Sequence, residues 1–383
     1  MKILFVCQQY IHSARWISQL KDSHHEIYVF DCLDRPVHKE LSWTNFIGDW
    51  SKRKFPYIKG EDRLKKAKPN LYRRIEGVLK VTPAEKLCEV IEEIKPDLVH
   101  SLEMQSQTYH ILKANKRFDF KWAYFCWGND LFAYQNQPSH KKRITDVMNQ
   151  LDFFFADTHR DIELAKKFGY KKKFSVVFPG GGGYEIKSYK PYIKPVEERK
   201  SVIIKGYQHN YGRALHILNA LELIIDKIKD QNIYVYSAHQ VVVDKIEELK
   251  IKHDLKIEYS TRNQELSHKD LLQKFGEAQI AIGNNSSDGI PNTLLEAMIC
   301  GAFPIQSNPG GATEDYIEDG VNGLLIQNPE NAQEVADKIT EALNNVQLRE
   351  KAFEINQQKA KELDYKVIQE KVLETYSKIE KSL

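Results

Sequence analysis

Four consecutive glycines, Gly180 to Gly183, follow Pro179 and divide the chain into two series of alternating strands and helices. Glycine loses more conformational entropy than other residues in a strand or a helix, so four in a row disfavour both. We therefore expect the chain to turn or hinge there. Before the glycines, apolar runs at residues 1–7, 26–31, 97–100, 121–126, 153–156 and 175–178 alternate with helical patterns. After them, the alternation resumes at 201–204, 232–237, 256–259, 278–282, 302–305 and 323–326.

Strand, helix and strand at this spacing predict parallel sheets with right-handed crossovers. We therefore expect an α/β fold with two Rossmann-like, doubly wound parallel-sheet domains facing each other across a cleft. The first domain would span residues 1–183 and the second 184–364, and an amphipathic helix at 365–383 would pack back on the first. The 383 residues suit two domains of this size. Open sheets of this kind bind ligands at the carboxyl ends of their strands, which would line the cleft.

The amino-acid composition limits the classes of function that the chain can have. The chain is 42% hydrophobic and 28% charged, and its net charge of +3 gives no reason to expect a nucleic-acid partner. Five widely spaced cysteines indicate reduced thiols in the cytoplasm, without a disulfide framework or a structural zinc site. The amino-terminal apolar stretch is typical of a first strand and not of a signal peptide. Since no run of about 18 apolar residues occurs, we expect any membrane contact to be peripheral.

Residues 283–316 carry the most specific pattern. A strand ends there in a polar loop that contains Asp288, and a helix is expected to start near Pro291, because proline is favoured in the first turn of a helix. The free N–H groups and dipole of that helix end suit a phosphate group. Asp288 and Glu296 stand before and within the helix, so both can face one ligand and accept hydrogen bonds from its hydroxyls.

The run from Gly289 to Met298 resembles the donor-site signature of the retaining GT-B glycosyltransferases of family 4. In that signature, two acids separated by seven residues flank a G-x-P-x-x-L-L-E-A-M motif. The resemblance implies that Glu296 holds the ribose hydroxyls of a nucleotide-sugar. It also implies that Asp288, where the family usually has glutamate, contacts the donor sugar and takes part in catalysis. The other donor-binding residues implied are Gly289, Ile290, Pro291, Asn292 and Thr293.

The same family grips the donor diphosphate with basic residues after the first strand of the second domain. This segment departs from the family's G-R…K-G pattern, because Tyr207 and Tyr211 stand near the usual basic positions. The nearest replacements are Lys205, with Gly206 beside it, and Arg213, which we expect to bind the diphosphate at a helix N-terminus and to act in catalysis. The alternative for Lys205 is a solvated lysine at a strand end.

The first domain supplies weaker candidates. Asp130 follows a strand directly, so it is predicted to be a catalytic residue that reaches the sugar or accepts the acceptor's proton; the alternative is a helix N-cap. Gln8, Gln9 and His12 in the first loop, and His100 at a strand end, resemble acceptor or phosphate contacts of the family. The alternative for His100 is a satisfied strand-end histidine.

Residues 34–80 contain 13 Lys/Arg against 6 Asp/Glu, interleaved with Trp43, Phe46, Trp50, Phe55, Tyr57 and Tyr72. Basic residues mixed with aromatics suit the headgroup layer of an anionic membrane, where a lipid-linked acceptor would wait at the inner face of the cell membrane. The alternative is a solvated insertion whose aromatic side chains pack on the first domain.

The resemblance implies a retaining, metal-independent hexosyltransferase without a cofactor. It would move sugar from a nucleotide-sugar, UDP favoured over GDP, to a glycan or lipid-linked acceptor in surface polysaccharide or glycan assembly. The sequence has no DxD-type acid pair in a matching position. Two alternatives remain: a nucleotide-sugar 2-epimerase of the same fold, and a non-catalytic GT-B-like binding subunit, which the tyrosines at 207 and 211 favour.

Overall fold

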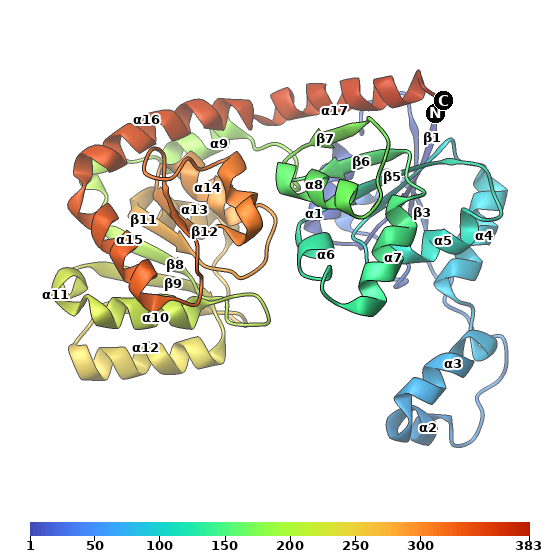
Figure 1. Ribbon diagram of the computed structural model, residues 1–383, viewed down its shortest axis with the longest axis horizontal. Helices are drawn as coiled ribbons and strands as arrows, with labels where there is room; N and C mark the ends of the chain where they lie inside the picture. Colours follow the sequence, from blue (N-terminus) through green and yellow to red (C-terminus); the bar gives the residue numbers. More distant parts are fainter.

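Two parallel sheets lie in separate halves of the molecule (Figure 1). This computed structural model describes the backbone of all 383 residues and every side chain except those of Arg73 and Arg74. The first sheet has seven strands in the order β3-β2-β1-β4-β5-β6-β7, and the second has six in the order β10-β9-β8-β11-β12-β13. All pairings are parallel. The predicted fold class is confirmed.

The strands coincide largely with the apolar runs of the sequence. The first sheet consists of β1 (Lys2–Val6), β2 (Glu26–Phe30), β3 (Asn45–Ile47), β4 (Leu98–Leu102), β5 (Lys121–Cys126), β6 (Phe153–Ala156) and β7 (Ser175–Val177). The second consists of β8 (Ser201–Lys205), β9 (Asn232–Ala238), β10 (Ile257–Thr261), β11 (Ala278–Gly283), β12 (Phe303–Ser307) and β13 (Leu324–Ile326).

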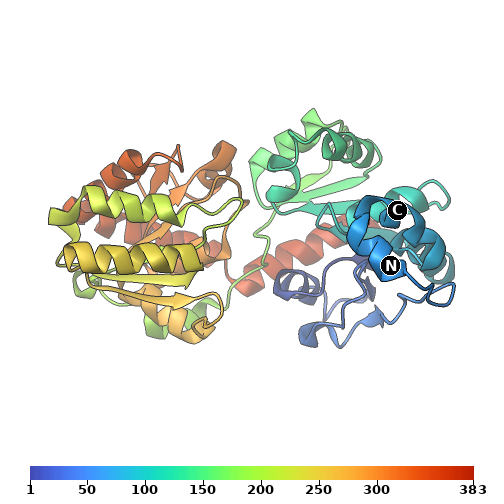
Figure 2. The ribbon, with the colours of Figure 1, turned by 90° about the horizontal axis from the view of Figure 1, so that it is seen from below.

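Helices cover both faces of each sheet (Figures 1 and 2). The helices before the glycine run are α1 (Ile11–Ser18), α2 (Glu61–Ala67), α3 (Pro69–Leu79), α4 (Pro83–Ile94), α5 (Ile111–Ala114), α6 (Asn129–Phe132), α7 (Pro138–Met148) and α8 (His159–Lys167), of which α2 and α3 project away from the sheet. The helices after it are α9 (Ile186–Tyr189), α10 (Ala214–Leu223), α11 (Ile225–Ile228), α12 (Gln240–His253), α13 (His268–Glu277), α14 (Asn292–Cys300), α15 (Ala332–Asn344), α16 (Val346–Glu362) and α17 (Tyr365–Glu380), of which α17 returns to the first sheet. Each sheet is thus buried on two faces, which explains why its strands are near-continuous apolar runs.

The chain crosses between the two halves twice, and the two crossings are hydrogen bonded to each other. The N–H of Tyr184, just after the glycine run, donates to the Leu363 carbonyl at 2.8 Å, and the Tyr365 N–H donates to the Tyr184 carbonyl at 2.8 Å. A side chain on Gly183 would lie 2.5 Å from Tyr365 Cα, so only glycine allows this approach. The glycine run therefore forms a tight junction between the two halves.

Helix α17 returns from the second half and packs on the first sheet, which brings the two termini together (Figure 1). Its side chains Ile368, Val372, Tyr376 and Ile379 are buried in the same core cluster as β1 and α1. The Tyr376 hydroxyl lies 2.7 Å from His100 Nδ1 and accepts a hydrogen bond from the Trp16 indole at 3.3 Å. The helix thus supplies both apolar cover and the buried partner of a histidine.

Helices α2 and α3 project from the body of the first half (Figure 1). They belong to the basic, aromatic segment at 34–80, in which the side chains of Arg73 and Arg74 lie outside the described residues. Trp50 and Tyr72 are buried and Trp43 and Phe46 pack partly on the first core, whereas Phe55 and Tyr57 are more than half exposed. The segment is therefore partly a packed insertion and partly an exposed apolar surface.

The local structure has two features that the pattern of apolar runs does not show. The short strand β3 lies inside the basic segment and was not predicted. Residues 214–228 form two helices, α10 and α11, because the backbone leaves the helical conformation at Ile224, where φ is −124°. Among the described residues, none of the helices combines the length and apolar character needed to cross a lipid bilayer.

We predict that Tyr376→Phe lowers the free energy of unfolding by about 1–3 kcal/mol, because it leaves the buried His100 nitrogen without its partner while keeping the ring. Tyr365→Phe on the same helix is the matched control, since among the described side chains its hydroxyl meets the Gln369 amide alone, at 3.5 Å. Urea unfolding of both variants tests the prediction. Equal stability of Tyr376→Phe and the wild type would contradict it.

Candidate functional site

A cleft of about 430 Å³ lies between the two sheets at the carboxyl ends of their strands. The first half contributes loops that follow β1, β4, β5, β6 and β7, and the second contributes loops that follow β8 and β11. The lining comprises Tyr10, His12, Glu103, Trp127, Asn129, Asp130, Asp157, Gly180, Gly181, Lys205, Tyr207, His209, Asn285, Ser287, Asp288, Ile290, Pro291, Asn292 and Thr293. This is the position at which doubly wound sheets bind ligands.

Asp130 stands on the first-half wall of the cleft. It is the second residue of α6, whose N-cap is Gly128, so the alternative of an N-capping role for Asp130 is wrong. Its Oδ2 accepts a hydrogen bond from the buried Tyr124 hydroxyl at 2.7 Å. Burial, and then the nearby Glu103 carboxylate, raise the pKa of Asp130. A carboxyl group with a raised pKa that lines a cleft is suited to proton transfer.

Asp157, which the sequence analysis missed, is the second acid on this wall. It follows β6 directly, and its Oδ2 accepts a hydrogen bond from the Ile290 N–H of the other half at 3.1 Å. Its Oδ1 has no hydrogen-bond partner among the residues that the structure describes. Burial, and then the neighbouring Asp161, raise the pKa of Asp157 well above its usual value. Asp157 belongs to no recognisable motif, so its place directly after a strand was the only sequence feature that could have indicated a site residue.

The loop from β11 to α14 forms the opposite wall. Asp288 Oδ1 accepts from the Gly289 N–H at 3.0 Å, and Oδ2 accepts from the Asn285 amide at 3.0 Å. Burial raises the pKa of Asp288, and the positive charge of Lys205 opposes this shift. Pro291 is the N-cap of α14 and not its first helical residue, and the helix then begins at Asn292 beside the cleft. The predicted approach of loop and helix end to one site is therefore present.

Lys205 and Tyr207 line the same wall at the end of β8. The Lys205 ammonium lies 4.6 Å from the centre of the Tyr207 ring, and the Arg262 guanidinium lies 4.8 Å from it. Arg262 Nη1 also donates to the Tyr207 hydroxyl at 2.6 Å. Tyr207 thus holds two cations together, one from β8 and one from the loop after β10. Sequence reasoning missed Arg262, because it stands in a polar loop without a recognisable spacing.

Arg213 does not point into this cleft. Its Nε donates to Glu330 Oε1 at 2.8 Å, and its Nη1 donates to the carbonyl oxygens of His209, Asn210 and Gly212 at 3.0–3.3 Å. The prediction of a guanidinium facing a diphosphate is corrected on this point: Arg213 is the N-cap residue of α10, as expected near a helix start, but its side chain folds back to hold its own loop. Gly206, in contrast, lies behind the cleft wall, where a side chain would meet Ala238 Cα at 2.6 Å.

Glu296 lies one turn inside α14 and is buried. Its Oε1 is 2.9 Å from His268 Nε2 at the start of α13, and this hydrogen bond raises the pKa of His268. His268 lines a second cavity of about 420 Å³ next to the cleft. A hydrogen bond of 3.0 Å from the Tyr184 hydroxyl to Asn292 lies where the two cavities adjoin. Asp288 therefore lines the cleft, whereas the buried Glu296 reaches the second cavity only through its partner His268.

The first-loop candidates separate into two groups. His12 lines the cleft, and its Nδ1 lies 2.9 Å from the Asn292 amide of the other half. Gln8 instead donates to Ser106 at 2.8 Å, and Gln9 accepts from the His38 N–H at 3.0 Å, both within the first half. His100 is fully buried under α17, so the expectation of a cleft-facing His100 is corrected. The alternative of a satisfied strand-end histidine holds only in part: His100 lies in the middle of β4, Nδ1 contacts Tyr376, and Nε2 has no hydrogen-bond partner among the described residues.

The two walls touch closely. A side chain on Gly128 would lie 2.2 Å from the Gly289 nitrogen, and one on Gly289 would lie 2.2 Å from Asp157 Oδ2. Arg160, at the start of α8, donates from Nη1 to the Asp288 carbonyl at 2.9 Å and to the Pro309 carbonyl at 2.7 Å. Its side chain is only 6% exposed and pairs with Asp161 at 2.9 Å. Arg160 therefore ties the first half to the loop that carries Asp288.

We predict that Arg160→Ala opens the cleft and lowers the free energy of unfolding by about 3 kcal/mol, because it leaves Asp161 as a buried, unpaired carboxylate. Small-angle scattering should show a larger radius of gyration, and urea unfolding should show the lower stability. The control is Arg143→Ala, which removes a guanidinium 3.8 Å above the Tyr109 ring within the first half. If Arg160→Ala changes neither quantity more than this control does, Arg160 does not hold the two halves together.

The comparisons with known proteins agree with this geometry. The family described as Glycosyl transferases group 1 matches residues 240–359, and the family described as Glycosyl transferase 4-like matches residues 2–158. The two matches cover much of both halves. By sequence, no curated protein is similar enough to this chain to count as a match.

Solved structures share the whole architecture. A glycosyltransferase from Rickettsia africae is 18% identical with a TM-score of 0.71, over 100% of this chain and 99% of that one. Anabaena HepE in complex with UDP is 15% identical with a TM-score of 0.69, over 99% and 100%. The lipopolysaccharide outer core galactosyltransferase WaaB is 15% identical with a TM-score of 0.70, over 100% of both chains. At these identities, the similarity shows a common GT-B fold. Since the two family matches, one in each half, are both to glycosyltransferase families, the chain is a glycosyltransferase of the GT-B type.

Proposed function

We propose that this glycosyltransferase moves a sugar from a UDP-sugar to a glycan or lipid-linked acceptor, with retention at the anomeric carbon and without a metal ion. The observation that carries the proposal is the loop from Asp288 to the start of α14, which lies across the cleft from Asp130 and beside Lys205. It combines a helix N-terminus, a cation and an acid within one cavity, as an anionic sugar donor requires.

The diphosphate of the donor binds at Lys205, with Arg262 behind Tyr207 as a second cation. The first-turn N–H groups of α14 face the same oxygens, since a helix N-terminus has free donors. These groups supply positive charge at the leaving group, which in other transferases comes from a divalent ion. The cations of the chain itself are thus the support for metal independence.

The nucleoside lies toward the second cavity, where Glu296 and His268 accept and orient the ribose. The resemblance of the Asp288–Glu296 run to the family motif supports this direction. Anabaena HepE structures contain UDP, UDP with glucose, and UDP-glucose, which supports UDP as the nucleotide here. The sugar then extends from the diphosphate into the cleft, toward Asp288 and Asp130.

Transfer with retention proceeds on the front face of the sugar. The bond from the anomeric carbon to the diphosphate oxygen breaks, and the acceptor oxygen bonds to the same face of that carbon. The acceptor proton passes to the departing diphosphate oxygen. Asp130 faces this region from the first-half wall and orients the acceptor hydroxyl. Lys205 and the helix N-terminus stabilise the charge that develops on the leaving group, so positioning and electrostatics supply the rate enhancement.

The acceptor is membrane-associated and reaches the enzyme beside the projecting helices α2 and α3. Phe55, Tyr57, Ile58, Leu71 and Val78 expose between 45% and 61% of their surface there. Exposed lysines and arginines surround them: Lys59, Arg63, Lys65, Lys66 and Lys68. An apolar tip with a basic rim matches an anionic membrane surface, which supports a role in surface polysaccharide or glycan assembly at the inner face of the cell membrane.

We predict that UDP and one UDP-sugar raise the thermal unfolding midpoint in the presence of EDTA, because a ligand that binds only the folded state stabilises it. In Lys205→Ala the affinity for UDP should fall at least about tenfold, since a charge-assisted hydrogen bond contributes about 1.5–3 kcal/mol. Glu296→Gln should weaken binding while keeping the shape of the site.

The matched control is Lys256→Ala, an exposed lysine at the opposite, amino-terminal end of the second sheet. If no nucleotide raises the unfolding midpoint of the wild type, the proposed nucleotide-sugar donor is wrong. If UDP raises the midpoints of Lys205→Ala and Lys256→Ala equally, Lys205 does not bind the diphosphate. Transfer by the purified single chain separates this proposal from a non-catalytic subunit, and release of a 2-epimer from the donor would indicate the epimerase instead.

We predict that the protein co-sediments with phosphatidylglycerol vesicles and much less with phosphatidylcholine vesicles. The triple variant Phe55→Ser, Tyr57→Ser, Ile58→Ser should bind about tenfold more weakly, because it removes the apolar part of the contact. Val241→Ser, Ile251→Ser changes exposed apolar residues of the second half and serves as the control. Equal sedimentation of both variants would show that α2 and α3 do not contact the membrane.

A further inference from the structure

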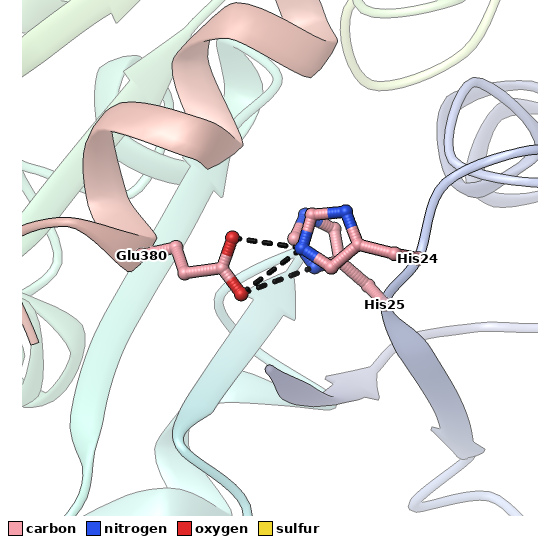
Figure 3. Close-up of side chains that lie close together, drawn as sticks. All are labelled: His24, His25 and Glu380. Atoms are coloured by element: carbon pink, nitrogen blue, oxygen red, sulfur yellow. Dashed lines mark hydrogen bonds and ion pairs between the residues drawn. The ribbon is translucent and has the colours of Figure 1, made fainter.

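Two consecutive histidines and a glutamate meet at the edge of the first sheet opposite the cleft (Figure 3). His24 and His25 immediately precede β2, so they lie at the amino ends of the parallel strands. Glu380 is the last residue of α17, and it reaches this edge because the helix packs back along the first half. One ligand atom from each of the three lies within 4.8 Å of the others.

His25 is the unusual member of this group. Its side chain is only 2% exposed, and its Nδ1 has no hydrogen-bond partner among the side chains that the structure describes. That nitrogen lies 3.9 Å from Glu380 Oε1, too far for a hydrogen bond but directed at the carboxylate. Burial, and then His24 and the Met1 ammonium, lower the pKa of His25 to about 4. A buried nitrogen without a partner is costly and requires an explanation.

The other two side chains lie within hydrogen-bonding distance of each other. His24 Nε2 lies 2.9 Å and 3.1 Å from the two Glu380 oxygens, and this ring is 69% exposed and accessible. The Met1 ammonium donates to Glu380 Oε1 at 2.9 Å and holds the pKa of this carboxylate at about 2. Two imidazoles and an ionised carboxylate thus converge, with the Met1 ammonium as the competing cation.

We propose that His24, His25 and Glu380 bind a divalent transition-metal ion, with zinc as the best match. Zinc accepts imidazole nitrogen and carboxylate oxygen in a tetrahedral arrangement with metal–ligand distances of about 2.0–2.2 Å, which places ligand atoms about 3.3–3.5 Å apart. To reach that spacing, the 3.9 Å from His25 Nδ1 to Glu380 must shorten and the 2.9 Å from His24 Nε2 to Glu380 must lengthen, each by less than about 1 Å. Magnesium and calcium prefer all-oxygen ligands and fit this set poorly.

The metal site clips the end of α17 to the start of β2. It satisfies the unpartnered nitrogen of His25 and replaces the Met1 ammonium as the counter-charge of Glu380. Because it lies at the amino edge of the sheet, the metal ion is separate from the cleft and takes no part in the transfer reaction. Its role is to stabilise the helix that joins the two halves of the enzyme.

The test uses the full-length protein, stripped with EDTA and then dialysed free of the chelator. Added Zn²⁺ should raise the thermal unfolding midpoint. Co²⁺ in its place should give the visible absorption of a four-coordinate site, with one ion per chain. His24→Ala should weaken Co²⁺ binding about tenfold or more, because loss of a direct ligand costs at least as much as loss of an outer partner. This histidine is exposed, so the variant should fold.

His253→Ala is the matched control, since His253 is a histidine 3.3 Å from Glu222 in the second half. It should bind Co²⁺ like the wild type. Absence of Co²⁺ and Zn²⁺ binding, or equal binding by His24→Ala and the wild type, would overturn the proposal. The response of the unfolding midpoint to UDP should be unchanged in His24→Ala, so failure of the metal site and failure of the donor site give different results.

Discussion

The hydrogen-bonded pair of chain crossings at Tyr184 and Leu363–Tyr365 is the constraint on which the two-domain arrangement depends. One crossing leaves the first domain after the glycine run, and the other returns to it and continues into α17. Because α17 buries one face in the first core, the return crossing is anchored, and the outgoing one is anchored to it. A side chain on Gly183 would separate the two. The relative position of the domains therefore follows from backbone pairing at the junction.

The mouth of the cleft is held in a different way. There the domains meet through polar contacts, such as His12 with Asn292, Arg160 with the Asp288 carbonyl, and His159 with Asp315 at 2.9 Å. Water can replace each of these contacts, whereas it cannot replace the apolar burial of α17. Breaking the contacts between the domains therefore requires less free energy at the mouth of the cleft than at the junction. We expect the domains to open about the junction. An enzyme that must admit a donor and an acceptor uses this difference in strength.

Strand positions could be predicted from the sequence because buried parallel strands are continuous apolar runs, and the loop from Asp288 to Asn292 because its motif is specific. Side-chain direction could not. Arg213 stands at the predicted helix start, yet Glu330, distant in sequence, decides where its guanidinium points. His100 ends inside the core because α17 covers its side of the sheet. Asp157 lines the cleft, and Arg262 contacts the cleft residue Tyr207, through strand order alone, which no local pattern reveals.

The cleft is electrostatically asymmetric, and in the proposed function this asymmetry orients the donor. On the first-domain wall, burial and neighbouring acids raise the pKa values of Asp130 and Asp157, so these carboxyl groups favour the protonated form and offer no positive charge to a phosphate. On the other wall, Lys205 and the start of α14 attract anions, although burial lowers the pKa of Lys205. In the proposed complex, a diphosphate offsets that burial cost by supplying negative charge. The proposal therefore places the diphosphate on the second domain, with the sugar toward the acids of the first.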